Sequence, residues 1–137
     1  MSTQVQPKKY LTVNQIFDKV WDHFHKKGVR LSKDHKTLDT ALSCKYRLNS
    51  KPKCKTRCAA GVLIKDEVYT PELEGGNIFR TVVEAALKDS GVDLCDCHIE
   101  DTVLQLQYKH DHSNTVNEFR NKLKDYKEEL IKKKLYV

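Results

Sequence analysis

The chain has 137 residues, of which 39% are hydrophobic and 32% charged, and its formal net charge is +6. This length fits one globular domain with a core of its own, and no apolar run is long enough to suggest a membrane span. The N-terminus also lacks the apolar region of a secretory signal. We therefore expect residues 1–9 to form a flexible tail and residues 10–137 to form a single globular domain.

The charge is distributed unevenly along the chain. Residues 1–60 and 118–137 are basic, whereas residues 61–117 are acidic. The basic parts can attract phosphate groups, or they can neutralise the acidic part when the chain folds. The five cysteines occur without an export signal, so we expect free thiols in a reducing compartment and no disulfide framework.

The first half of the chain predicts two helices and a small β element. Residues 12–28 have apolar side chains at helical spacing, a Thr12–Gln15 capping box and Gly28 as a stop signal. Alternation within residues 38–48 predicts a strand, and a turn follows at residues 49–52. The apolar stretch CAAGVLI, residues 58–64, is short, and its small residues favour a helix over a strand.

The second half predicts three further helices. Asn77 is expected to cap a helix that Gly91 ends, after an irregular loop over residues 70–76. Residues 99–108 form the next predicted helix, and Thr115 with Glu118 makes a capping box that opens a long terminal helix. The expected architecture is mainly α, a compact helical single domain with a small β element near residues 38–48.

Zinc binding is one functional hypothesis. Thiolate and imidazole suit tetrahedral zinc, and the candidate ligands are Cys54, Cys58, Cys97 and His98. Their spacing contains no Cys-x2-Cys pair, so buried, inert thiols are the favoured interpretation and no cofactor is expected.

Acid–base chemistry is a second hypothesis. His110, with Asp66, Glu67 or Glu74 as partner or metal ligand, would make a small acid–base or metal-dependent hydrolase. The same side chains can instead satisfy one another in a buried polar network. Whether the protein is an enzyme stays open at this point.

Anion binding through residues 45–57, the basic segment, is the third hypothesis. Between Thr40 and Arg57 the chain has six basic residues and no acidic one, and an aromatic ring among them can stack on a base. No established nucleic-acid-binding signature accompanies the segment. The candidate ligand-binding residues are Lys45, Tyr46, Arg47, Lys51, Lys53, Lys55, Arg57 and Tyr69.

Three stretches resemble a family of small bacterial and phage-encoded proteins. The shared pattern runs Tyr-Arg at residues 46–47, C-A-x-G-x-L-I-x-D-E-x-Y-x-P-x-x-E-G at residues 58–75, and L-Q-x-x-H-D at residues 106–111. The resemblance covers roughly half of the chain and implies a set of residues rather than an activity. Cys54 and Cys97 lie outside the pattern, which weakens the zinc hypothesis. Arg47, Asp66 and His110 lie inside it.

These observations favour a binding protein. We expect a small cytoplasmic binding or regulatory accessory protein, encoded by a bacterium or a phage and, if by a phage, acting in the host cytoplasm. It would dock a host protein, a nucleic acid or another phosphate-bearing ligand through the basic segment, without a membrane. The small hydrolase and the structural zinc module are the alternatives. In the network interpretation, Arg47 pairs with Glu74 or Asp66, and Tyr69 bonds His110.

Overall fold

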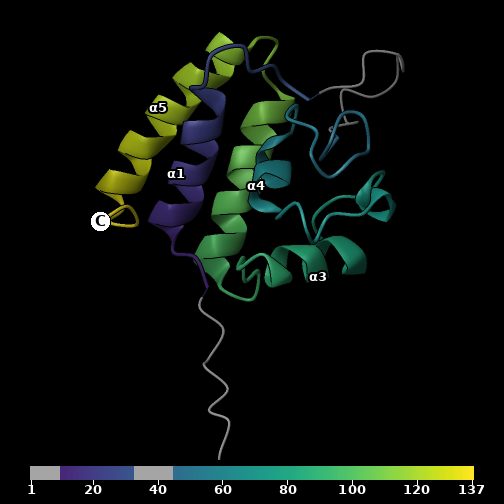
Figure 1. The fold of residues 1–137 in the computed structure, drawn as a ribbon. Coiled ribbons are helices and arrows are strands. Elements are labelled where there is room, and N and C mark those ends of the chain that lie inside the picture. The colour runs from purple at the N-terminus through teal and green to yellow at the C-terminus, as the bar shows by residue number, and fades with distance from the viewer. Residues whose placement is uncertain (1–9, 33–44) are drawn as a thin grey trace, which may run out of the picture.

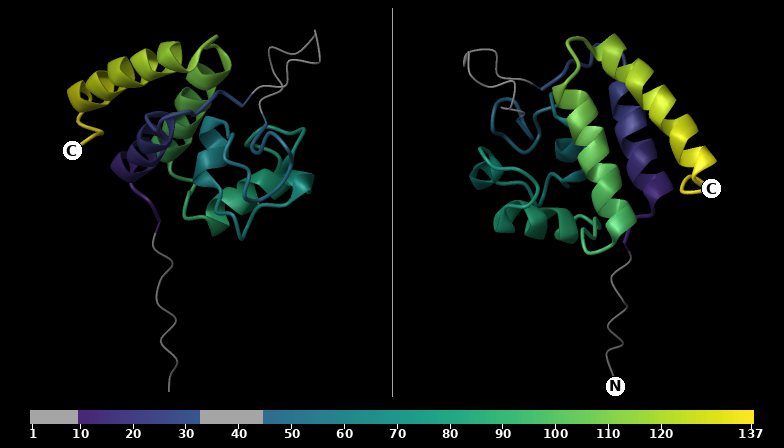
Figure 2. Two further views of the ribbon diagram at one scale, coloured as in Figure 1. Left: turned by 45° about the horizontal axis from the view of Figure 1, so that its top comes forward. Right: turned by 180° about the vertical axis from the view of Figure 1, so that it is seen from behind.

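The computed structural model describes residues 10–32 and 45–137. These residues form five α-helices and one short 3-10 helix, and they contain no strand. Helices α1 (Val13–Phe24), α4 (Cys97–Asp111) and α5 (Val116–Lys132) all contact one another and form one side of the molecule (Figure 1). The short helix α2 (Ala59–Leu63) packs against α1 and α4. Helix α3 (Thr81–Asp89) and the 3-10 helix η1 (Pro71–Leu73) lie beyond it, as both views in Figure 2 show. The prediction of a mainly α, single helical domain is confirmed.

Helix α1 begins as predicted but ends earlier. Thr12 accepts a hydrogen bond from the Gln15 N–H, and the Gln15 side chain accepts one from the Thr12 N–H, which completes the predicted capping box. The last helical residue is Phe24, and the chain leaves the helix at His25. Gly28, with φ of +80°, lies in the turn that follows. The predicted end at residue 28 was therefore a few residues too late, because that glycine shapes a turn outside the helix.

The predicted β element is not found where the structure can test it. Residues 45–48 form bends and turns, and residues 38–44 lie outside the described residues. The backbone N–H groups that a sheet would use have other partners. Those of Tyr46 and Arg47 bind the Glu74 carboxylate, and that of Lys45 binds the Ser32 carbonyl. In contrast, the short helix predicted at residues 58–64 is confirmed as α2.

The remaining helices are confirmed with shifted boundaries. Helix α3 starts at Thr81, because Asn77 uses its side chain to cap a preceding turn at the Phe79 N–H. The apolar spacing of this helix also predicts that Val82 is buried with Val83, Ala86 and Leu87, but Val82 is 39% exposed. Gly91, with φ of +92°, ends the helix as predicted.

Helices α4 and α5 begin at well-defined side-chain caps. Asp96 accepts hydrogen bonds from the N–H groups of residues 98 and 99, so α4 starts earlier than the expected residue 99. Thr115 caps α5 by accepting the Glu118 N–H. The Glu118 side chain accepts the Asn114 N–H, whereas the predicted capping box would use the N–H of Thr115. The apolar spacing of this helix predicts an inward face of Val116, Phe119, Leu123, Tyr126 and Leu130. The last four are buried, and Val116 is half-buried.

The core is built mainly from α1, α2, α4 and α5. Its largest fully buried apolar side chains come from α1, α4 and α5, together with Ile64 and Leu87. Arg47 and His110 are the two largest of six buried polar residues among the described residues, and such buried polar groups need internal partners. Within residues 10–32 and 45–137, no helix combines the length and the apolar composition that crossing a membrane requires.

Candidate anion-binding site

Arg47 is the centre of a buried hydrogen-bond network beneath the basic segment. An arginine side chain has five N–H donors, and here all five have an acceptor. Four are backbone carbonyls: Nε donates to Pro52, Nη1 to Tyr46 and Gly61, and Nη2 to Ile64. The fifth acceptor is the carboxylate of Asp66, 3.2 Å from Nη2. The side chain is 0% exposed, so Arg47 uses its donors to hold the fold together and presents none of them at the surface.

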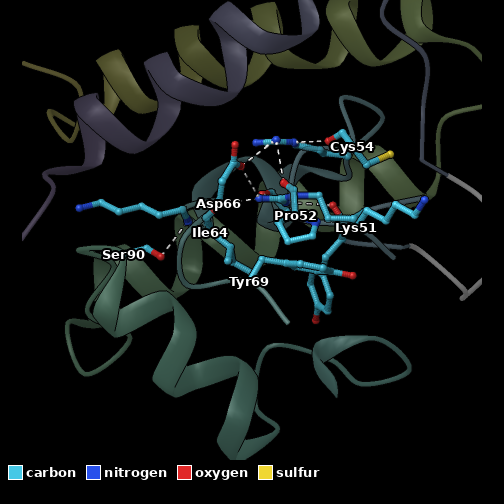
Figure 3. Close-up of polar contacts among 12 residues, drawn as sticks. Lys51, Pro52, Cys54, Ile64, Asp66, Tyr69 and Ser90 are labelled. Atoms are coloured by element: carbon cyan, nitrogen blue, oxygen red, sulfur yellow. Dashed lines mark hydrogen bonds and ion pairs between the residues drawn. The ribbon is translucent and has the colours of Figure 1, made fainter. Parts of the chain in front are cut away.

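The acceptors of Arg47 come from two separate segments. Figure 3 shows Pro52 and Cys54 of the basic segment on one side of the network and Ile64 and Asp66 on the other. Burial, reinforced by the neighbouring cation of Arg57, lowers the pKa of the Arg47 guanidinium, and Asp66 opposes this effect. The network therefore joins the basic segment to the chain that follows α2.

Arg57 is the second arginine bound to Asp66. Its Nη2 lies 2.8 Å from Oδ1 of Asp66, and its Nε donates to the Cys54 carbonyl at 2.7 Å. The same carboxylate oxygen therefore receives Arg47 and Arg57. Asp66 is one of the acids that the sequence offers as a candidate catalytic group or metal ligand, and here its carboxylate binds two arginines. Glu67, its exposed neighbour, is not one of the residues that bind either arginine.

Glu74 fixes the start of the basic segment from the other side. Its two carboxylate oxygens accept the backbone N–H groups of Tyr46 and Arg47, each at 3.0 Å. The hydroxyl of Tyr69 donates to Glu74 at 2.5 Å, and its ring lies beneath the Arg47 guanidinium at 5.0 Å. Burial and the bond to Glu74 raise the pKa of Tyr69 well above its ordinary value. The network thus pairs Arg47 with Asp66, and Tyr69 with Glu74 instead of with His110.

Gly61 allows the backbone of Tyr46 to approach α2. A Cβ atom at this position would lie 2.9 Å from Cα and C of Tyr46, and closer still to its carbonyl oxygen. The Gly61 carbonyl is also one of the acceptors of Arg47. This glycine therefore serves close packing, which is the structural reason for its place among small residues.

His110 belongs to a second buried network, on α4. Its Nε2 accepts the Ser32 N–H at 3.2 Å, and its Nδ1 lies 3.0 Å from Oδ1 of Asp111. This arrangement describes a neutral imidazole that carries its proton on Nδ1. The side chain is fully buried, and the rings of Phe24 and Phe119 pack against it.

The second network also holds the basic segment. Ser32 donates its hydroxyl to the Lys45 carbonyl at 2.6 Å, so His110 acts on the segment through Ser32. Gln107 accepts the N–H of Ala60, the second residue of α2, and donates to Asp111 at 2.8 Å. The contacts of His110 thus lie on elements other than those that carry Asp66, Glu67 and Glu74. The contacts of His110 described above therefore do not include these carboxylates, and the hydrolase hypothesis stays a prediction.

The four candidate zinc ligands do not converge. Among the described residues, no group of three or more histidine, cysteine or acidic side chains is placed to hold a metal ion. Cys58 is buried and accepts the Gly61 N–H as the N-cap of α2, whereas Cys97 and His98 are exposed in the first turn of α4. Cys58 lies apart from the exposed Cys97 and His98 because it packs as a small buried residue and caps α2.

The basic segment forms a closed loop above these networks. The Leu48 N–H donates to the Thr56 carbonyl at 3.0 Å and closes the loop. The Ser50 N–H donates to the Arg47 carbonyl at 2.9 Å, and Ser50 adopts φ of 58° in the turn predicted at residues 49–52. The loop therefore has defined backbone geometry without regular secondary structure.

The lysines of the loop are its free charges. Lys51, Lys53 and Lys55 are exposed, and none of them has a carboxylate partner within the part of the chain that the structure describes. Lys51 points away from the Arg47 network in Figure 3. Lys45 is half-buried. Of the eight candidate ligand-binding residues, Tyr46, Arg47 and Tyr69 are thus structural, and the three exposed lysines form the accessible surface.

The residues that support the basic segment from below could not be identified from the sequence. Ser32 and the backbone acceptors Pro52, Gly61 and Ile64 carry no sequence signal for their role. Comparisons of the chain with protein-family models, with curated proteins and with solved structures gave no match. The resemblance to small bacterial and phage proteins stays a prediction, and the function has to be argued from the geometry.

Proposed function

We propose that the protein is a small binding module that docks a phosphate-bearing polyanion through Lys51, Lys53 and Lys55. The observation that carries this proposal is the contrast within the basic segment. Its arginine at position 47 is fully buried and saturated, whereas the three lysines are exposed without a carboxylate partner among the described residues. A fixed loop that carries unpaired cations loses less conformational freedom when it binds.

Nucleic acid suits this surface better than the acidic face of a protein does. Lysine is depleted at protein–protein interfaces, whose cores are apolar and aromatic. Phosphate contacts, in contrast, depend on lysine and arginine charges and on the release of counterions. The large hydrophobic side chains that the described residues expose, such as Phe79 and Tyr108, lie outside the basic segment. We therefore infer that the ligand is single- or double-stranded nucleic acid, bound without sequence readout.

The test is a binding titration with charge-matched variants. The probe is a fluorescent single-stranded oligonucleotide of about 16 nucleotides, followed by anisotropy at low salt. The variant K51Q/K53Q/K55Q removes the proposed contacts, and the control K88Q/K124Q/K132Q removes the same charge from exposed positions on α3 and α5. We expect the first variant to bind about tenfold more weakly, or worse, and the control to bind almost as the wild type does.

Two results would contradict the proposal. Equal losses in both variants would show that net charge, and not the loop, determines binding. Absence of binding by the wild-type protein at low salt would exclude nucleic acid and leave an acidic protein surface as the partner of the loop. Arg57 is left unchanged in these variants because it supports the loop through Asp66 and Cys54.

A further inference from the structure

A groove of about 450 Å³ lies beside the basic segment, lined by α1, the chain that follows α2 and the C-terminal end of α3. Two hydrogen bonds hold its walls together. The Lys65 N–H donates to the Ser90 hydroxyl at 2.9 Å, near the left edge of Figure 3, and the Leu11 N–H donates to the Gly91 carbonyl at 2.8 Å. The groove is therefore part of the folded architecture, and its volume falls within the range of small-molecule sites.

Three cations line the groove. Arg57 is 17% exposed and is oriented by its bonds to Cys54, Pro52 and Asp66, which use Nε and Nη2. Among the described residues, no acceptor binds its Nη1 atom, so these two N–H donors are available to a ligand. Lys19 and Lys65 are exposed at the groove and have no carboxylate partner in the same part of the chain.

The negative groups of the groove are largely compensated. Asp66 shares one oxygen between Arg47 and Arg57, so two cations accompany this carboxylate. Asp89 adds a second negative charge. The carbonyls of Ala86, Leu87 and Lys88 near the end of α3 are already bonded to the N–H groups of residues 90–92, which limits the negative potential at this helix end. Three cations and two carboxylates therefore line the groove, and the buried Arg47 behind Asp66 adds further positive charge, so the groove favours an anion.

We propose that this groove binds a phosphate monoester attached to an organic group of nucleotide size. In this proposal Nη1 of Arg57 donates hydrogen bonds to the phosphate, and the exposed side chains of Lys19 and Lys65, which line the same groove, add positive charge. Arginine gives such a group directional donors, and lysine gives it mobile point charges. The apolar lining, which includes Leu11 and Val62, covers the uncharged part of the ligand.

Two kinds of molecule carry a phosphate monoester of this size. One is the terminal phosphate of a nucleic-acid strand, and this version rests on the proposed function, because Arg57 is the last residue of the basic segment. The other is a free mononucleotide, which needs no binding by the loop. The experiment therefore has one arm for each source.

The first arm compares two single-stranded oligonucleotides of one sequence, with a 5′-phosphate or a 5′-hydroxyl. The second compares adenosine monophosphate with adenosine in a calorimetric titration. We expect the wild-type protein to prefer the phosphorylated form in at least one arm, by about tenfold. K19Q/K65Q should lose this preference, and the control K88Q/K124Q should keep it, with unchanged circular dichroism in both.

The outcomes separate this inference from the proposed function. K51Q/K53Q/K55Q should weaken the binding of both oligonucleotides by the same factor and leave the ratio of the two affinities unchanged. The proposed function of the loop can therefore be wrong while the groove still prefers the phosphorylated form. No preference by the wild-type protein in either arm overturns the inference. A preference that survives in K19Q/K65Q, or disappears in K88Q/K124Q as well, also overturns it, because the groove lysines then play no specific part.

Discussion

Replacing Arg47 by methionine should remove a large part of the stability of the domain. The substitution keeps a long side chain but deletes five hydrogen bonds inside the fold. A buried acceptor without a partner costs about 1–3 kcal/mol, and breaking a buried charged pair costs about 3–5 kcal/mol. These costs overlap, since Asp66 keeps Arg57 and part of the loop can relax. We expect the free energy of unfolding to fall by about 4 kcal/mol, against a typical total of about 5–15 kcal/mol.

Urea denaturation followed by circular dichroism measures this loss. With a slope near 2 kcal/mol per molar urea, the midpoint should fall by roughly 2 M. Arg57→Gln is the matched control, because it removes the same charge from a partly exposed side chain and should cost about 1 kcal/mol. Arg47→Lys should resemble Arg47→Met more than the wild type, because an ammonium cannot reach acceptors on both sides of the network. An Arg47→Met midpoint within about 0.5 M of the wild type would refute the scaffold role of Arg47.

Three further substitutions test the scaffold and the electrostatics. Gly61→Ala should cost about 1–3 kcal/mol of unfolding free energy, because the new methyl group meets the Tyr46 backbone, whereas an unhindered helix position would gain up to about 1 kcal/mol. Glu74→Gln turns an amide toward a backbone N–H and should cost about 2 kcal/mol, while the charge-matched control Glu72→Gln on the exposed η1 helix should be near neutral in the same urea assay. Burial, and secondarily nearby cations, lowers the pKa of His23 from 6.5 to about 4. The unfolded chain therefore binds this proton first as the pH falls from 6.5 to 4, and the wild type should lose roughly 1–2 kcal/mol more than His23→Leu over this window, after allowance for solvent screening of a partly exposed side chain. Parallel pH dependence of the two proteins would contradict this origin.

The helices could be predicted from local signals, because their caps and apolar faces are encoded within a few residues of each other. Thr12 and Thr115 cap helices as their spacing indicates, and Gly91 ends one. The errors in the helix boundaries arose where a residue that commonly marks a helix end shapes a neighbouring turn instead. Asn77 caps a turn before α3, and Gly28 shapes a turn after α1.

The candidate site could be predicted in composition but not in geometry. The run of basic residues identified the loop, yet nothing local distinguishes Arg47, which is fully buried, from the exposed Lys51. The difference depends on backbone carbonyls supplied by residues 14 and 17 positions further along the chain. Similarly, the burial of His110 follows from its packing between α1 and α5.

The pattern residues now have a common physical role. Those of the first and second stretches fix the loop through Arg47, Asp66 and Glu74. Of the third stretch, His110 fixes the start of the loop through Ser32, and Gln107 holds α2 at Ala60. A preformed loop of this kind presents its lysines at little cost in conformational entropy.

The salt dependence of oligonucleotide binding tests the central claim most directly. For a single strand, the logarithm of the association constant falls with the logarithm of salt concentration, with a slope of about −0.7 for each phosphate contact. If Lys51, Lys53 and Lys55 each contact a phosphate, K51Q/K53Q/K55Q should have a slope shallower than the wild type by about 2. K88Q/K124Q/K132Q should keep the wild-type slope. Equal slopes for the wild type and the loop variant would contradict the claim that this loop docks the ligand.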